Sequence, residues 1–202
     1  MLHVSQTTSA LVAALQCSRD EDAWRELDRR YRPVMVAIGV RLGLTHADAE
    51  DAAQETLARV AVALRDRRFD RQRGRLRTWI LQIARNCISD ARRRRTARRE
   101  HRGESAFEDV ALPEALDAAW EEECRRAVVE RALDELRSAT DFDARTIEAF
   151  ERVGLAGRPA AEVADELGLS VDSVYAAKSR CTRVLREIVT RLSEAYEVPP
   201  PD

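Results

Sequence analysis

The 202-residue chain has few of the residues that favour sheets and tight turns. Aromatic residues make up 5% of it and there are seven glycines, whereas charged residues make up 35%. This balance disfavours a sandwich or barrel and predicts a helical protein. No apolar run approaches the roughly 20 residues needed to span a bilayer, and no signal peptide opens the sequence. We therefore expect a soluble, cytoplasmic protein without membrane insertion.

Cysteine and histidine are also scarce, and their spacing offers no covalent or metal framework. Cys87 and Cys124 fall on apolar helical positions, where a small buried thiol is the ordinary expectation. The three histidines lie near no cysteine, and no two cysteines form a CxxC pair. We expect no disulfide, no metal site and no cofactor. The four cysteines are Cys17, Cys87, Cys124 and Cys181.

Charge is unevenly distributed along the chain, although the net formal charge is only -2. Residues 59–102 hold 16 arginines and four acidic residues, whereas residues 104–151 hold 15 acidic residues and five arginines. A basic block suits a polyanion, and the acidic block must lie elsewhere. On charge alone, two solvated helix surfaces would explain the same pattern. Lys178 is the only lysine; the arginine bias fits bidentate phosphate or guanine contacts, but a GC-rich genome is the explanation we favour.

Apolar residues at helical spacing predict an all-α chain in two parts. In the first part, Pro33 should bend or break one helix, and Gly43 should end it. Periodicity is lost between about residue 97 and residue 112, where the composition is that of a flexible linker. Three residue pairs fit helix N-terminal caps: Ser18 with Glu21, Thr45 with Asp48, and Thr140 with Asp143.

A basic amphipathic helix is predicted after Phe69, where the chain reads FDRQRGRLRTWILQIARNCISDARRRR to Arg95. Such a helix can pack its apolar side on a core while its arginines hold a polyanion. Trp79 lies on the apolar side, so we expect it in the core rather than stacked on a base. The apolar side consists of Leu76, Trp79, Ile80, Ile83, Ala84, Cys87 and Ile88.

A helix-turn-helix pattern begins at Arg158 and reads RPAAEVADELGLSVDSVYAAKSRCTRVLREIV. Pro159 suits the first turn of a short helix, Gly168 allows a tight turn, and Ser170 can cap a second helix. An ordinary helical hairpin is the alternative. In a helix-turn-helix, the N-terminal half of the second helix enters the major groove. The candidate DNA contacts are Ser170, Ser173, Tyr175, Ala176, Lys178, Ser179, Arg180 and Arg183, with Arg180 and Arg183 best placed for phosphate.

Together these segments resemble the extracytoplasmic-function (ECF) sigma factors of bacterial RNA polymerase. DAEDAAQETLARV (Asp48–Val60) resembles the polymerase-binding helix of sigma region two, and the basic helix resembles the strand-opening, minus-10-reading segment. RPAAEVADELGLSVDSVYAAKSRCTRVLRE resembles the helix-turn-helix of region four, which reads the minus-35 element. The resemblance implies two small helical domains, region 2 over residues 8–98 and region 4 over residues 126–195, joined by a flexible linker over residues 99–125.

The resemblance also assigns roles to individual residues. Asp51, Gln54 and Glu55 match the acidic helix that docks on the coiled coil of the largest polymerase subunit. Without the neighbouring motifs, an ordinary solvated acidic face would explain these three residues equally well. Asn86 matches a position that lines the pocket for a flipped minus-10 base. The remaining minus-10 candidates are Phe69, Arg75 and Arg77 along the separated strand, and Arg92, Arg93 and Arg94 on phosphates of the duplex edge.

We therefore expect a sigma factor without catalysis of its own. Its partners would be core RNA polymerase and promoter DNA, both duplex and single-stranded, and an anti-sigma factor stays open. Tyr175 and Ala177 replace basic residues that are common in the recognition helix, so the minus-35 sequence is not predicted. Rival interpretations are a conventional helix-turn-helix regulator, a nuclease, and an anti-sigma-type interaction protein. The nuclease would need clustered acids or a His/Cys constellation, which the sequence does not offer at convincing spacing.

Overall fold

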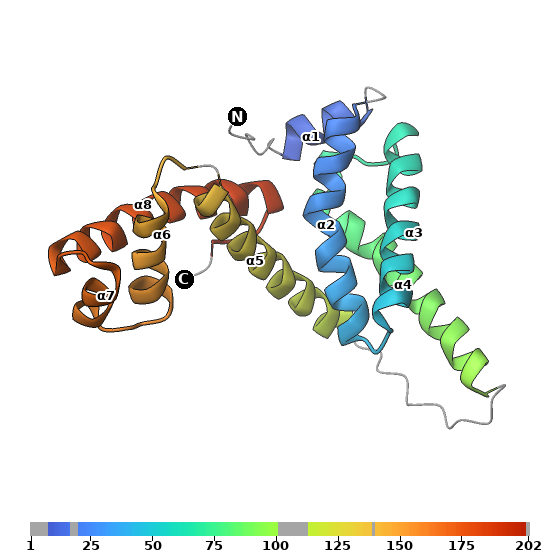
Figure 1. Cartoon of the computed structure of the whole chain (residues 1–202). Coiled ribbons are helices and arrows are strands. Elements are labelled where there is room, and N and C mark those ends of the chain that lie inside the picture. The colour runs from blue at the N-terminus through green and yellow to red at the C-terminus, as the bar shows by residue number, and fades with distance from the viewer. Residues whose placement is uncertain (1–7, 17–19, 101–112, 139, 201–202) are drawn as a thin grey trace. The chain divides into compact units, whose positions relative to one another are not determined.

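The computed structural model describes residues 8–16, 20–100, 113–138 and 140–200. These residues form helices and no strands, which confirms the predicted all-α fold class (Figure 1). No helix among them is both long and apolar enough to cross a bilayer. The elements are α1 (Thr8–Gln16), α2 (Glu21–Arg41), α3 (His46–Arg65), the 3-10 turn η1 (Arg71–Arg73), α4 (Leu76–Glu100), α5 (Pro113–Ser138), α6 (Ala144–Phe150), the π-helical turn η2 (Glu151–Leu155), α7 (Ala160–Leu167) and α8 (Val171–Tyr196).

The described residues divide into two compact units. Residues within 6–127 and 194–201 form the N-terminal unit, and residues 128–193 form the C-terminal unit. The structure differs from the predicted boundaries, because α5 begins at Pro113 and its first half belongs to the N-terminal unit. Residues 113–125 of the predicted linker are therefore helical. Residues 101–112 lie outside the described part of the chain.

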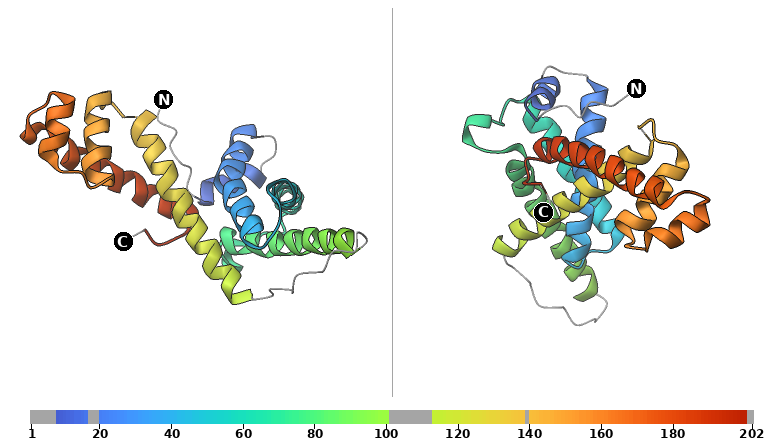
Figure 2. Two further views of the ribbon diagram at one scale, coloured as in Figure 1. Left: turned by 60° about the horizontal axis from the view of Figure 1, so that its bottom comes forward. Right: turned by 90° about the vertical axis from the view of Figure 1, so that its left-hand side faces the viewer.

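In the N-terminal unit, α2 and α3 lie side by side and α4 packs against α3 (Figures 1 and 2). Gly39 allows the close approach of α2 and α3, since a Cβ atom built on it would lie 2.8 Å from the Cβ of Ala49. Burial of the apolar stripes from these three helices supplies most of the driving force for folding. The stripes contribute Leu27, Val34, Ile38, Ala53, Val60, Leu64, Ile80, Ala84, Cys87 and Ile88 to the core.

Helix boundaries in this unit follow the local sequence with one exception. Thr45 caps α3 as predicted, because its hydroxyl accepts a hydrogen bond of 3.1 Å from the backbone N–H of Asp48. Gly43 follows the end of α2 with a φ of +88°, a conformation that glycine adopts without strain. The prediction was a bend or a break at Pro33, and α2 does not break there: it continues through Pro33, which lies on its exposed side, where water can bond the carbonyl left free. Asp20 caps α2, and the proposed cap residue Ser18 lies outside the described residues.

Segments from the far end of the chain complete the core of the N-terminal unit. The ring of Tyr31 lies 6.4 Å from that of Trp120 and 6.1 Å from that of Tyr196, centroid to centroid. Arg30 is fully buried; its guanidinium lies 5.5 Å from the Tyr196 ring centroid and donates hydrogen bonds to the Ala195 carbonyl and to Glu26. The start of α5 and the end of α8 are thus structural parts of this unit.

The C-terminal unit contains the second half of α5, α6, α7 and most of α8, and α6, α7 and the start of α8 contribute to a small apolar core. Gly168 ends α7 in the left-handed conformation with a φ of +61°, and the Ser170 hydroxyl accepts a hydrogen bond of 3.1 Å from the Ser173 N–H at the start of α8. This is the geometry expected for a helix-turn-helix. The core consists of Ala149, Val153, Ala160, Val163, Ala164, Leu167, Val174 and Ala177.

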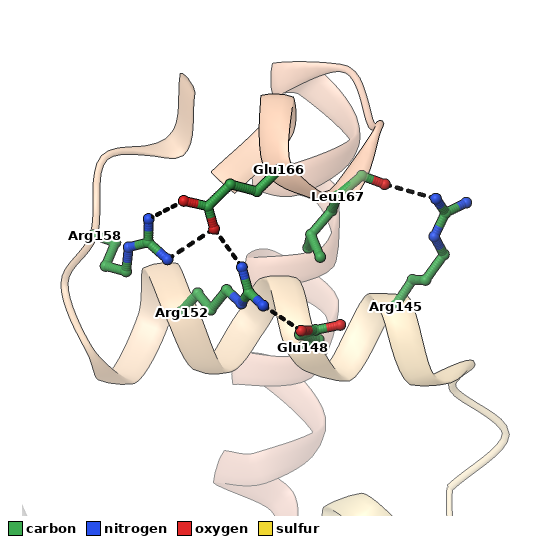
Figure 3. Close-up of polar contacts among 6 residues, drawn as sticks. All are labelled: Arg145, Glu148, Arg152, Arg158, Glu166 and Leu167. Atoms are coloured by element: carbon green, nitrogen blue, oxygen red, sulfur yellow. Dashed lines mark hydrogen bonds and ion pairs between the residues drawn. The ribbon is translucent and has the colours of Figure 1, made fainter. Parts of the chain in front are cut away.

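Polar contacts fix α7 on the preceding turns (Figure 3). Glu166 accepts hydrogen bonds from Arg152 and Arg158, and the pairing holds the pKa of its carboxyl below the ordinary value, with the Arg158 hydrogen bond as the main cause. Arg145 donates to the Leu167 carbonyl at 2.7 Å, which satisfies a free acceptor at the end of α7.

The predicted pairing of Thr140 with Asp143 as a helix cap is wrong. Asp143 alone caps α6 by accepting from the Thr146 N–H at 2.9 Å. The Thr140 hydroxyl instead donates to the Leu136 carbonyl at 2.6 Å, at the end of α5.

Candidate nucleic-acid interface

An acidic depression of about 410 Å³ lies between α3 and α4. It brings together Asp51, Gln54 and Glu55, the three residues predicted to bind polymerase, and all three are exposed. Carboxylates gathered in an open depression can receive basic side chains of a partner, with a gain mainly in steering and register. The lining is Asp48, Asp51, Ala52, Gln54, Glu55, Ala58, Ala91 and Arg94.

Arg94 is therefore placed with the polymerase-binding candidates, although the sequence suggested a phosphate contact. Its Nε–H donates to the Asp90 carbonyl at 3.3 Å. Arg93, its exposed neighbour, pairs with the Asp90 carboxylate at 2.6 Å and holds the pKa of that group below its ordinary value. Phosphate binding by Arg92, Arg93 and Arg94 stays a prediction.

A second depression, the Asn86 pocket, opens beside the first and measures about 470 Å³. The carboxamide of Asn86 shares it with two arginines, Arg59 and Arg68, over an apolar floor. Val62 forms part of that floor and is 53% exposed, so its side chain is accessible to a ligand. The lining is Ala58, Arg59, Val62, Ala63, Arg68, Ile83 and Asn86.

Sequence reasoning placed Asn86 in a pocket only through the family resemblance, and it missed the other polar residues there. Arg59 lies three residues before Val62 and four before Ala63, so helical spacing could have placed its side chain on the same face of α3 as these two lining residues. Arg68 follows the end of α3 and carries no periodic signal. Its Nη2 lies 2.9 Å from the Asp66 carboxylate.

The loop after α3 is anchored by an aromatic pair rather than left open. Phe69 is only 6% exposed and its ring centroid lies 5.1 Å from that of Trp79. A contact between Phe69 and a DNA strand would require this pair to separate, so its direct role as a DNA contact receives no support from the geometry. Arg75 is exposed and available for such a contact.

Arg77 differs from the other minus-10 candidates because acidic groups already surround it. Its side chain is 13% exposed, and its Nη1 lies 3.9 Å from the Glu121 carboxylate. Its backbone N–H donates to Glu197 at 3.3 Å. Arg85, which lies further along α4, pairs with Asp117 at 3.3 Å. The start of α5 therefore sets acidic groups against part of the basic helix.

The candidate minus-35 residues all lie exposed at or near the start of α8. A groove of about 600 Å³ follows one face of this helix. It extends the predicted surface to Thr182 and Arg186, which recur at intervals of three or four residues from Lys178 and which the sequence analysis did not single out. Ser170 uses its hydroxyl as a helix cap. The groove is lined by Tyr175, Lys178, Ser179, Thr182, Arg183, Arg186 and Glu187.

Within the described residues, no group of three or more His, Cys, Asp or Glu side chains is arranged to hold a metal ion. Cys87, Cys124 and Cys181 are buried, free thiols. Burial raises the pKa of the Cys124 thiol to about 12. A thiol held protonated in this way is a poor nucleophile.

Comparison with known proteins finds similarity to sigma factors over part of the chain. Residues 27–98 match the model of the family described as Sigma-70 region 2. The chain is also 34% identical over 85 residues to the ECF RNA polymerase sigma factor RpoE of Cereibacter sphaeroides. That alignment covers 42% of this chain and 46% of the relative, so it spans about half of the relative's length.

Both the acidic depression and the Asn86 pocket lie within the matched residues 27–98. The similarity to Sigma-70 region 2 therefore includes both depressions. The matches agree with the resemblance of this part of the chain to region two of the ECF sigma factors.

Proposed function

We propose that this protein is a sigma factor that directs core RNA polymerase to specific promoters and assists strand opening. One observation carries the proposal: α3 presents the acidic depression and the Asn86 pocket side by side, with Ala58 in the lining of both. A surface for polymerase and a surface for an unpaired base then adjoin each other. A factor of this kind needs that proximity, because the polymerase it recruits acts on the strand it separates.

Asp51, Gln54 and Glu55 are the residues we assign to polymerase. Their partner would be the basic, coiled-coil surface of the largest subunit, as the family resemblance implies. Opposite charge on the two surfaces speeds encounter and fixes register. Asp51 and Glu55 line the same depression, so one basic surface could meet both carboxylates.

Asn86 is the residue we assign to an unpaired minus-10 base. Extracting a base from the duplex stack costs a few kcal/mol, and contacts in a pocket offset this cost. The apolar floor, which includes Val62 and Ile83, can cover the face of the base. Asn86 can offer both a hydrogen-bond donor and an acceptor to the edge of the base. Arg75 and the arginines at the end of α4 would follow the phosphates.

The helix-turn-helix of the C-terminal unit is the part we assign to the minus-35 element. Lys178 and Ser179 lie on the exposed groove face of α8 and can reach base edges in a major groove. Arg183 and Arg186 follow on the same face and suit phosphates. Nucleotidyl transfer would belong to polymerase, and the protein would act in the cytoplasm with it. Regulation by an anti-sigma factor stays a prediction of the resemblance.

Run-off transcription with core polymerase tests the proposal. The purified chain is added to core enzyme on genomic fragments, and RNA start sites are mapped. We expect discrete new start sites that depend on the protein. A conventional helix-turn-helix regulator would instead bind duplex DNA tightly without polymerase, at palindromic half-sites, and would start no RNA. That result would reject the sigma-factor assignment.

A further inference from the structure

The Asn86 pocket contains hydrogen-bond donors besides the carboxamide of Asn86. Arg59 and Arg68 both line it, and a guanidinium carries five N–H donors and no acceptor. Asn86 contributes one acceptor and an amide donor group. The polar part of the pocket is therefore dominated by donors.

Each of the two arginines pairs with a carboxylate outside the pocket lining, and both pairs are exposed to solvent. Arg59 donates through Nε to Glu55 at 2.9 Å, one turn back on α3. Arg68 pairs through Nη2 with Asp66 at 2.9 Å. Each of these contacts uses one nitrogen of the guanidinium, which leaves its remaining N–H groups available to a planar ligand.

A donor-rich pocket favours a base with adjacent acceptors. Guanine offers O6 and N7 side by side, the pair that arginine binds in bidentate fashion. Adenine places an amino donor beside N7, which would face guanidinium N–H groups without a bond. Cytosine has adjacent acceptors but a smaller ring, which covers less of the apolar floor formed by Val62, Ala63 and Ile83.

We infer that Arg59 and Arg68 make the Asn86 pocket selective for guanine as the flipped base. The inference rests on the proposed capture of an unpaired minus-10 base and adds its identity. It assigns Arg68 as a specificity-determining residue, since this arginine belongs to the loop after α3 and is not part of the acidic depression.

The test uses the full chain with core polymerase and a promoter fragment recovered by run-off transcription. Partly single-stranded versions of the fragment carry each of the four bases, or an abasic site, at each unpaired minus-10 position, and the dissociation constant is measured for each. One position should lose affinity when abasic. At that position, we expect guanine to bind roughly 5- to 100-fold more tightly than adenine, the range of a good bidentate contact.

Variants of Arg68 separate hydrogen-bond selection from simple charge attraction. Arg68→Ala and Arg68→Lys should both reduce the guanine-to-adenine ratio toward one, because lysine keeps the charge but loses the bidentate fork. Arg71→Ala is the matched control: Arg71 is an exposed arginine of the same loop outside the pocket lining, and its loss should weaken all bases equally.

The outcomes separate the inference from the function on which it rests. If no abasic position weakens binding, base capture itself fails, and the selectivity fails with it. If one position does, but adenine binds there as tightly as guanine, or Arg68→Ala leaves the ratio unchanged, base capture stands and guanine selection by Arg68 is overturned.

Discussion

Glu55 and Arg59 form an ion pair of 2.9 Å on α3, and each lines a different depression. The hydrogen bond to Glu55 raises the pKa of Arg59 above its ordinary value, so the guanidinium stays charged. A basic polymerase group that binds Glu55 would compete for the carboxylate that positions Arg59. The two depressions are thus connected through one pair of side chains.

Charge reversal in the acidic depression should prevent polymerase binding. Asp51→Arg places a cation among carboxylates that we expect to meet a basic partner, and Asp51 is exposed, so the fold should persist. Binding to core enzyme is measured by calorimetry, with circular dichroism as the check on folding. Glu130→Arg, a reversal at an exposed position of α5, should bind normally. Unchanged affinity of the Asp51 variant would refute the assignment.

Two variants on the groove face of α8 should affect duplex binding differently. Lys178→Ala should cost about 1–3 kcal/mol on the cognate minus-35 site if Lys178 contacts a base, and little on unrelated DNA. Arg186→Ala should weaken both and reduce the salt dependence by about one counterion, as expected for a phosphate contact. Fluorescence anisotropy at several salt concentrations distinguishes the two. Identical losses on both DNAs for Lys178→Ala would place the recognition face elsewhere.

Removing an acidic neighbour of Arg77 should strengthen binding to single-stranded DNA. Glu121 lies 3.9 Å from the Arg77 guanidinium and competes with phosphate for it. An ion pair of this kind is worth up to about 1 kcal/mol, so Glu121→Gln should raise affinity several-fold at low salt. Glu122→Gln is the control, because Glu122 pairs with Arg41 instead. Equal affinities of the two variants would show that Arg77 does not contact the strand.

Stability should fall at alkaline pH in part because of Cys124. Burial raises the pKa of this thiol to about 12, so the folded protein keeps the proton that the unfolded chain loses near the ordinary value. The unfolded state then binds fewer protons, and the free energy of unfolding decreases as pH rises, by at most about 1.4 kcal/mol per pH unit for one thiol. Urea unfolding at pH 8 and pH 10 should show a smaller decrease for Cys124→Ala than for the unaltered chain. The same decrease in both would exclude Cys124 as a source.

Local patterns predicted much of this structure, because helices, caps and turns are determined by nearby residues. Periodicity gave the helices and their apolar sides, and Thr45 and Ser170 cap helices as their spacing indicated. Long-range pairing left no such signal. No local pattern indicates that Tyr196 packs against Tyr31, or that Arg30 is buried beneath it.

The sequence predicted one candidate site better than the other. The exposure of the candidate minus-35 residues follows from helical spacing. The Asn86 pocket does not, since Arg68 reaches it from a loop whose course depends on the packing of Phe69 against Trp79.

The aromatic cluster of Tyr31, Trp120 and Tyr196 limits how freely this protein can exchange modules with its relatives. A chimera that replaced only residues 27–98 would replace Tyr31 but keep Trp120 and Tyr196, the two rings that pack against it. Residues at these three positions should accordingly covary among relatives. A working chimera should include α5 and the end of α8 together with residues 27–98.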